Sequence, residues 1–240
     1  MKTILNYIWR AWFLVLASFS TIIFGIPVVL FSIRPKHFPY AYFFIRLWCF
    51  VLFYGMGFRY SLERKTTEKL SENQQYILIA NHTSVIDIML MCILHSRHPI
   101  CFVGKAELGK IPIFSIIYKR ICILVDRKDP KSRAAVYTQS AEKMKQGQNI
   151  VIFPEGGVPD DTSIILDDFK DGAFKLSVQH HFPIAVYTFI GLKEMFPFNH
   201  GEGYPGKVRV VLCDILPPTD DFQTMKLNAR EIMLNELKSS

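Results

Sequence analysis

A histidine and an aspartate stand five positions apart in the segment NHTSVID, residues 81–87, where they could form a catalytic pair. The segment follows the apolar run YILIA, which is typical of a buried strand. On one continuous helix, residues five apart point about 140° away from each other. His82 and Asp87 can therefore meet only if His82 lies in the turn before a helix and Asp87 lies in its first turns. In that arrangement the Asp87 carboxylate holds one ring nitrogen of His82 and leaves the other free to take a proton from a hydroxyl group.

The rest of the chain indicates that this hydroxyl belongs to the substrate. No G-x-S-x-G elbow, which would supply a serine nucleophile, occurs anywhere in the sequence. The other histidines lack the spacing and the neighbouring carboxylates of a zinc site. The segment GEGYPGKV at residues 201–208 nearly fits a phosphate-binding loop, but it ends in valine and precedes a predicted strand. We therefore expect no metal site and no nucleotide loop of this kind.

Cationic and glycine-bearing residues follow three further predicted strands. Lys105 and Arg127 each come just after an apolar run, where an ammonium and a guanidinium group can hold a phosphate. Taken singly, each is equally well explained as a solvated surface charge. The turn at residues 154–157 contains Gly156 and Gly157, which let backbone N–H groups approach a ligand closely. Because ligands gather beyond the carboxyl ends of strands in α/β domains, these residues and His82 form one candidate site.

Short β-rich runs alternate with stretches of helical spacing from about residue 66 onward. Strands are predicted at residues 75–80, 100–103, 121–125, 149–153, 183–189 and 207–213. Helices are predicted at residues 84–95, 130–146, 169–180 and 220–238. This alternation predicts an α/β fold, a layered mixed β-sheet flanked by helices.

Two apolar stretches precede this domain. Residues 11–33 carry no charge, and about 20 apolar residues can cross a bilayer core, although Pro27 is expected to kink such a helix. Residues 40–58 are rich in aromatic side chains and contain Arg46, which fits a helix at the headgroup level. We predict a membrane-associated helical pair dipped into one leaflet. The alternatives are one span plus an interfacial helix, or a buried hairpin of a soluble protein.

The first apolar stretch is expected to be a retained anchor. It is longer than the roughly 7 to 15 residues of a signal-peptide core, and it lacks a convincing small-x-small cleavage site before Pro27. We therefore divide the chain into membrane-anchoring helices at residues 1–65 and a catalytic α/β domain at residues 66–240.

The basic residues point to a membrane surface as a partner. The net charge is +7, and residues 1–65 hold eight of the 28 basic residues but one of the 21 acidic residues. The remainder is balanced, with 20 of each sign. A basic excess within the most apolar part suits anionic lipid headgroups, whereas no nucleic-acid-binding motif is present. The five cysteines have no paired or metal-type spacing. We expect the catalytic domain on the cytosolic face of the cytoplasmic membrane, in a reducing compartment.

Four blocks of the sequence together resemble the glycerolipid acyltransferase family. NHTSVID matches the family's N-H-x-S-x-x-D block, the stretch from Lys105 to Arg127 matches its lysine-to-D-R block, and FPEGG matches the start of F-P-E-G-T-R. FKDGAF at residues 169–174, followed by PIAV, resembles the last block. The resemblance runs from about Tyr76 to Val186 in the family's order.

The resemblance implies an O-acyltransferase that needs no metal or bound cofactor. It implies that His82 is the general base, that Asp87 orients it, and that a lysolipid hydroxyl attacks the thioester of acyl-CoA or acyl-carrier protein. Because the F-P-E-G block is associated with the acceptor, Glu155, Gly156 and Gly157 become substrate-binding candidates. The resemblance adds Asn81 and Ser84 as substrate-binding candidates, and it implies the same role for Lys105 and Arg127.

One position departs from the family pattern. Val158 stands where the family has an arginine, which is a strong bidentate phosphate ligand. Either Arg127, Lys105 or Lys170 supplies that charge, or the acceptor is a lyso-aminolipid. We expect 1-acyl-sn-glycerol-3-phosphate, the commonest acceptor of the family. Two different classes of protein stay open: a thioesterase that uses the same base on water, and a lipid-binding scaffold without chemistry.

Overall fold

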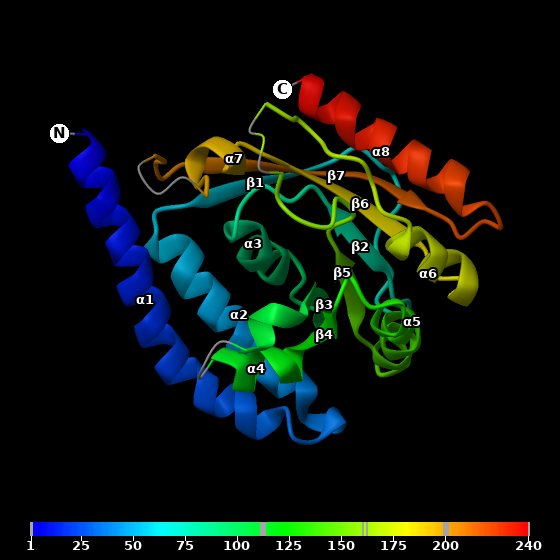
Figure 1. Cartoon of the computed structure of the whole chain (residues 1–240), viewed down its shortest axis with the longest axis horizontal. Coiled ribbons are helices and arrows are strands. Elements are labelled where there is room, and N and C mark those ends of the chain that lie inside the picture. Colours follow the sequence, from blue (N-terminus) through cyan, green and yellow to red (C-terminus); the bar gives the residue numbers. More distant parts are fainter. Residues whose placement is uncertain (1, 111–113, 160, 162, 199–201, 240) are drawn as a thin grey trace.

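The chain is built around one mixed β-sheet (Figure 1). The computed structural model describes residues 2–110, 114–159, 161, 163–198 and 202–239. The strands lie in the order β1-β7-β6-β2-β5-β3-β4, and every neighbouring pair is parallel except β6 and β7. Their bounds are β1 Arg59–Arg64, β2 Ile77–Ala80, β3 Ile100–Lys105, β4 Cys122–Val125, β5 Asn149–Ile152, β6 Ile184–Ile190 and β7 Lys207–Leu216. The predicted mixed sheet is confirmed.

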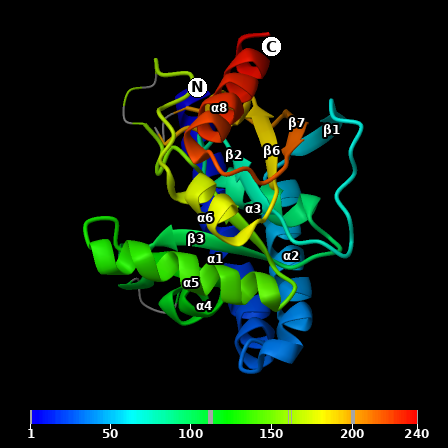
Figure 2. The ribbon, with the colours of Figure 1, turned by 90° about the vertical axis from the view of Figure 1, so that its right-hand side faces the viewer.

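Helices cover both faces of the sheet (Figures 1 and 2). The helices α1, α2, α3 and α4 contribute to the core on one face, and α5, α6 and α8 contribute to the core on the other. Their bounds are α1 Lys2–Phe31, α2 Phe38–Gly55, α3 Ile86–Leu94, α4 Phe114–Ile121, α5 Pro130–Lys145, α6 Gly172–His180, α7 Leu192–Met195 and α8 Phe222–Lys238. Two short 3₁₀ helices, η1 Pro35–His37 and η2 Ala106–Lys110, complete the order.

The apolar run before the NHTSVID segment forms the centre of the sheet. All four residues of β2 are buried because the strand is covered on both faces. Leu78 and Ala80 pack into one core, whereas Ile77 and Ile79 pack into the other, as the alternation of a strand requires. The end of β2 is therefore held firmly by packing, and it fixes where the NHTSVID segment begins.

The N-terminal helices lie against one side of the domain. Both are long and apolar enough to cross a membrane by length and composition. Only 17% of the apolar window of α1 is buried, against 44% for the second helix, so α1 does not resemble the core helix of a soluble protein. Helix α1 is continuous through Pro27. These features are those of the membrane-associated pair predicted from the sequence.

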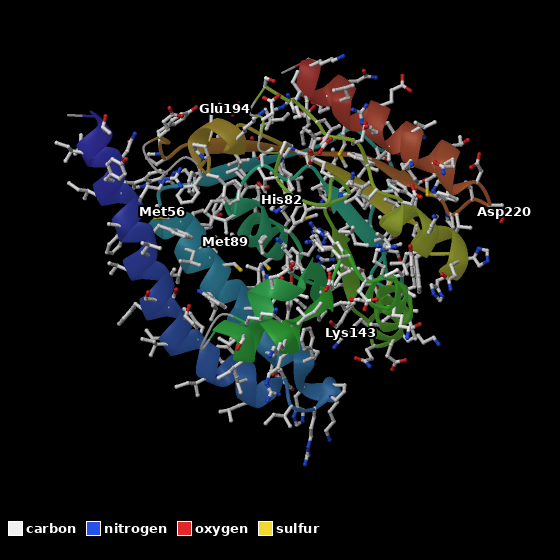
Figure 3. All side chains as sticks on the ribbon, in the orientation of Figure 1. Met56, His82, Met89, Lys143, Glu194 and Asp220 are labelled. Carbon is white, nitrogen blue, oxygen red and sulfur yellow. The ribbon has the colours of Figure 1, made fainter. Side chains whose placement is uncertain are left out.

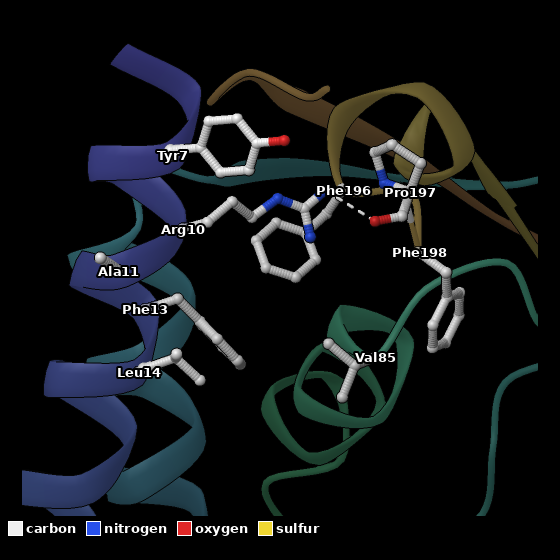
Figure 4. A pocket seen from close by; sticks show the side chains of 9 residues that line it. All are labelled: Tyr7, Arg10, Ala11, Phe13, Leu14, Val85, Phe196, Pro197 and Phe198. Atoms are coloured by element: carbon white, nitrogen blue, oxygen red, sulfur yellow. Dashed lines mark hydrogen bonds between the residues drawn. The ribbon is translucent and has the colours of Figure 1, made fainter. Parts of the chain in front are cut away.

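A buried arginine fastens α1 to the catalytic domain (Figure 4). Arg10 donates from Nη2 to the backbone oxygen of Pro197 at 2.6 Å and to that of Glu202 at 2.9 Å. Its guanidinium lies 3.8 Å from the centre of the Phe196 ring. A cavity of about 360 Å³ opens beside it, lined largely by apolar residues of α1, by Val85 and by the segment after α7. The first helix is thus docked close to the start of α3.

The sequence reasoning missed strand β1, helices α4 and α7, and the two 3₁₀ helices. Strand β1 is mostly polar, and it pairs in parallel with β7 at the edge of the sheet. Glu63 of β1 pairs with Arg209 of β7 at 2.9 Å, and Arg209 also pairs with Glu236 of α8 at 3.0 Å. Helix α4 packs against α1, where a side chain added at Gly25 would meet Ile117 at 2.8 Å. All of the strands and helices that the sequence predicted are present.

Candidate active site

The predicted contact between His82, which is labelled in Figure 3, and Asp87 is present in the structure. His82 lies in the connection between β2 and α3, and Asp87 is the second residue of α3. The Nδ1 atom of His82 lies 2.9 Å from Oδ2 of Asp87, which also accepts backbone N–H groups from Thr83 at 2.6 Å and Ser84 at 2.9 Å. A carboxylate can only accept, so Nδ1 carries the proton and Nε2 is the acceptor. The arrangement leaves Nε2 of a neutral imidazole to take a proton.

The chain folds this way locally because Asp87 closes the start of its own helix. Its carboxylate is fully buried, and an anion at a helix N-terminus is stabilised by the N–H groups and dipole there. Only 18% of the His82 side chain is exposed. The His82 side chain is therefore partly exposed, whereas that of Asp87 is fully buried.

An aromatic stack supports the face of the imidazole. The ring centres of His82 and Phe153 are 4.2 Å apart at an angle of 15°, and Phe102 stacks on Phe153 at 6.4 Å. Phe153 follows β5, and Phe102 lies in β3, the neighbouring strand. The imidazole is therefore fixed both by its edge, at Asp87, and by its face.

The Glu155 carboxylate holds the backbone of the histidine. Its Oε1 accepts the N–H of His82 at 2.7 Å, and its Oε2 accepts the N–H of Asp167 at 3.0 Å. Burial raises the pKa of Glu155, while these two N–H groups act in the opposite direction. Both oxygens are engaged by the protein itself, so the glutamate joins the turn after β5 to the turn after β2.

Asn81 and Ser84 also bond to the framework. The amide of Asn81 exchanges two hydrogen bonds with the backbone of Phe189, at 2.8 and 2.7 Å. The Ser84 hydroxyl donates to the backbone oxygen of Phe196 at 2.8 Å. Both side chains are buried. Their placement tethers the NHTSVID segment to β6 and to the segment after α7.

In the turn after β5, a basic side chain lies beside each of the two glycines. Gly156 has a φ of 81°, which favours glycine, and a side chain there would meet Cγ of Lys170 at 3.4 Å. A side chain at Gly157 would lie 3.7 Å from Nη1 of Arg127. Lys105 is exposed at the end of β3 and does not line the cavity described next. The structure thus brings Arg127 and Lys170 to the turn.

A cavity of about 770 Å³ adjoins this turn. It lies between α5, α6 and the ends of β3, β4 and β5. The charged and aromatic residues among its lining are Arg127, Arg133, Tyr137, Phe153, Lys170, Asp171 and Lys175. Phe153, whose ring stacks on His82, is among the lining residues, whereas His82 itself is not.

Comparison with known proteins places the chain in a family. The model of the acyltransferase family matches residues 61–189, more than half of the chain. The chain belongs to the acyltransferase family. It is an enzyme that transfers acyl groups, and the resemblance drawn from its four sequence blocks is confirmed.

Several curated proteins are similar to this acyltransferase. A 1-acyl-sn-glycerol-3-phosphate acyltransferase of Helicobacter pylori is 29% identical over 67% of this chain and 67% of its own length. A human protein named 1-acyl-sn-glycerol-3-phosphate acyltransferase beta is 27% identical over 70% of this chain and 59% of its own. A chloroplastic relative of Brassica napus is 26% identical over 78% of this chain and 53% of its own. The alignments thus span between about half and two thirds of the relatives.

One solved structure has the same fold. The crystal structure of the 1-acyl-sn-glycerophosphate acyltransferase PlsC from Thermotoga maritima matches with a TM-score of 0.80 and 21% sequence identity. The match covers 100% of this chain and 97% of that one. The mixed sheet and its flanking helices are therefore shared.

The acyltransferase site has no metal-binding cluster among the described residues, and it includes residues that the sequence did not predict. Within the described ranges, no group of three or more His, Cys, Asp or Glu side chains could hold a metal ion. Sequence reasoning missed Phe102, Phe153 and Arg133 as site residues. The phenylalanine of the F-P-E-G block was a signal for Phe153, but nothing in the sequence placed Phe102 or Arg133 beside it.

Proposed function

We propose that this acyltransferase moves a fatty acyl group from a thioester donor to the free hydroxyl of 1-acyl-sn-glycerol-3-phosphate, giving phosphatidic acid. The single observation that carries the proposal is the His82 imidazole, held by Asp87 at 2.9 Å with Nε2 left as acceptor. A positioned neutral imidazole is the group best suited to take a proton from a hydroxyl near neutral pH.

The proposed transfer has two steps, and His82 carries the proton between them. The acceptor hydroxyl attacks the thioester carbonyl and gives its proton to Nε2 of His82, so a C–O bond forms. The C–S bond then breaks, and the departing sulfur takes the proton back from the imidazolium. The buried Asp87 carboxylate favours the imidazolium between these events, because opposite charges attract strongly where water is excluded.

The phosphate of the acceptor needs a cation in place of the family arginine. Val158 cannot supply one, but Nη1 of Arg127 lies 3.7 Å from the side-chain position of the preceding Gly157. A guanidinium can bind a phosphate through two N–H groups. This placement supports a phosphate-bearing acceptor, as do the names of the curated relatives. We assign Lys105 a lesser part.

The acceptor is proposed to reach the site from a membrane. Helix α1 exposes large apolar side chains along its length and is docked near α3 through Arg10. An interfacial position lets a lysolipid present its hydroxyl without leaving the lipid phase. We place the catalytic domain on the cytosolic face of the cytoplasmic membrane.

The test is an acceptor panel on vesicles that carry the purified protein. Labelled acyl-CoA and acyl-carrier protein are each offered 1-acyl-sn-glycerol-3-phosphate, other lysophospholipids and a lyso-aminolipid, with His82→Ala as the blank. Transfer to the phosphate acceptor, with a KM that rises about tenfold in Arg127→Gln, is the expected result. Transfer to the lyso-aminolipid alone would contradict the proposed acceptor. Release of free fatty acid without any acceptor would indicate a thioesterase.

A further inference from the structure

One peptide unit lies between an arginine of α8 and the glutamate that holds the backbone of His82. This unit, the bridging peptide, joins Leu166 to Asp167 in the segment between β5 and α6. Its oxygen accepts Nη2 of Arg230 at 3.1 Å, and its N–H donates to Oε2 of Glu155 at 3.0 Å. The oxygen and the N–H of a planar trans peptide point in opposite directions, so the two contacts hold the bridging peptide from both sides.

The guanidinium of Arg230 contacts two successive carbonyl groups of this segment. Its Nε donates to the oxygen of Asp167 at 3.2 Å, beside the contact of Nη2 with the oxygen of Leu166. An ion pair with Asp168 at 3.4 Å adds little, because the Asp168 side chain is 86% exposed. The planar fork of a guanidinium suits two neighbouring acceptors. The main contribution of Arg230 is therefore to orient the backbone.

Apolar packing places this segment against α8 (Figure 1) but does not orient its peptide groups. The side chains of Leu166 and Phe169 are buried in the core that also contains Met225 and Ala229 of α8. Such packing fixes where the segment lies. The direction of a backbone N–H depends instead on the hydrogen bonds that its peptide makes. Arg230 supplies these bonds on the side of the bridging peptide that faces away from Glu155.

The buried carboxylate of Glu155 depends on the N–H groups around it. Glu155 is 4% exposed, and among the described residues it forms no ion pair with Lys or Arg. Burial raises its pKa, and the N–H groups of Asp167 and His82 act against this effect. A cation on the oxygen of a peptide polarises that peptide and strengthens the hydrogen bond that its N–H donates. Arg230 thus stabilises the charged form of Glu155 through the bridging peptide.

We propose that Arg230 is a positioning residue for acyl transfer, which acts on His82 through the bridging peptide and Glu155. This inference rests on the proposed role of His82 as the base. The second oxygen of Glu155 accepts the N–H of His82 at 2.7 Å, so the path that starts on α8 ends at the backbone of the base. The path is separate from Asp87, which holds the edge of the imidazole.

The first test compares Arg230→Met with Lys226→Met in acyl transfer. Lys226 lies one turn earlier on α8 and also ties this helix to the domain, but its ammonium pairs with Asp171 at 2.7 Å rather than with the bridging peptide. We expect Arg230→Met to lower kcat about tenfold and to change the KM of either substrate by less than about twofold. Lys226→Met should leave kcat unchanged. An equal loss of kcat in both variants would mean that any weakening of α8 docking slows transfer, and it would overturn the proposal.

A double-mutant cycle tests whether Arg230 acts through Glu155. The kcat of Glu155→Gln is compared with that of Glu155→Gln combined with Arg230→Met. In the Glu155→Gln background, the second substitution should lower kcat by less than about twofold, because the carboxylate that the bridging peptide holds is already absent. Losses that multiply would mean that Arg230 acts by another route, and they would refute the proposal.

Amide hydrogen exchange separates this inference from the proposed function, because the measurement needs no substrate. The exchange rates of the His82 and Asp167 amides are expected to rise about tenfold in Arg230→Met and to stay unchanged in Lys226→Met. This result would support the path from Arg230 to His82 even if no lysolipid accepts an acyl group. Unchanged exchange of both amides in Arg230→Met would refute the path even if acyl transfer occurs.

Discussion

At the residue scale, three separate contacts fix the position of His82. Asp87 holds Nδ1, Phe153 supports the ring face, and Glu155 accepts the backbone N–H. Loss of any one contact leaves the other two in place, so each variant can be interpreted without assuming a collapsed site. The contribution of each contact to the rate is therefore measurable separately.

Asp87→Asn is expected to reduce kcat by roughly 10² to 10⁴-fold with little change in KM, by analogy with hydrolytic triads. The amide oxygen of the asparagine can take the place of Oδ2, and the amide nitrogen that of Oδ1. In the described part of the chain, Oδ1 of Asp87 has no hydrogen-bond partner that the exchange would remove. The geometry is kept, but the neutral side chain cannot stabilise an imidazolium. Steady-state kinetics on vesicles measures the effect.

Asp220→Asn is the control for this substitution. Asp220 is an exposed acid in the loop before α8, far from His82 in the molecule (Figure 3). Its replacement should leave kcat unchanged. Equal rates in Asp87→Asn and Asp220→Asn would contradict the assigned orienting role.

His95 is expected to make stability depend on pH. It is buried, with its ring against Tyr187 at 5.5 Å, and burial lowers its pKa to about 3, with a smaller effect of the charge on His98. Between this value and the usual 6.5, the unfolded chain binds a proton that the folded chain does not. Stability therefore falls as the pH decreases through this window, by roughly 2 kcal/mol from pH 7 to pH 5.

The His95→Phe variant tests this origin of the pH dependence. The hydrogen bond that the Tyr42 hydroxyl donates to residue 95 goes to its backbone oxygen at 2.7 Å, so the substitution leaves that bond intact. The difference in Tm between pH 7 and pH 5 should be smaller in the variant than in the unmodified protein. An equal difference in both proteins would show that other groups cause it.

At the element scale, the sequence predicted the buried elements well because their patterns arise from burial. Strands β2 and β5 are short apolar runs whose residues are almost all buried. Strand β1 has the sequence RYSLER and no buried residue, so its pairing with β7 depends on contacts that periodicity does not report. Helix α4 packs through Ile117 against Gly25 of α1, a tertiary contact that a local pattern does not report.

Arg10→Met is predicted to lower the free energy of unfolding by about 1 to 2 kcal/mol, because two part-buried backbone oxygens lose a charged donor. We also expect kcat to fall, since Pro197 follows Phe196, whose oxygen accepts the Ser84 hydroxyl beside the base. Thermal unfolding in detergent and transfer kinetics on vesicles measure the two effects.

Arg34→Met serves as the control for Arg10, because Arg34 is exposed between α1 and η1. It should change neither Tm nor kcat. A loss of stability in Arg10→Met with an unchanged transfer rate would mean that the docking of α1 supports the fold but not the site.

At the scale of the whole molecule, the sheet separates two environments. Apolar helices lie on one face, and the cationic cavity lies on the other, with His82 and the turn after β5 between them. The sequence predicted which residues follow the strands. It did not predict that Glu155 would bind backbone N–H groups or that Arg133 would join the cavity, because both depend on how turns and helices pack in three dimensions.

Membrane association is predicted to depend on the exposed face of α1. Ile22 and Ile26 are 68% and 64% exposed, and Leu227 on α8 is 65% exposed. Replacing Ile22 and Ile26 with Asp should lower binding to vesicles by at least about tenfold, since it removes apolar burial and adds charge. Leu227→Asp, a matched change on a helix of the opposite face, should have no effect. Co-sedimentation with vesicles decides, and equal binding by both variants would refute the membrane role of α1.

The most direct test of the account is the initial rate of acyl transfer to 1-acyl-sn-glycerol-3-phosphate by His82→Ala, on vesicles and with both thioester donors. The account predicts that transfer falls to the level of protein-free vesicles, while Tm and vesicle binding stay those of the unmodified protein, because His82 lies in a connection and its side chain is partly exposed. A transfer rate close to that of the unmodified protein would contradict His82 as the base, and with it the proposed mechanism.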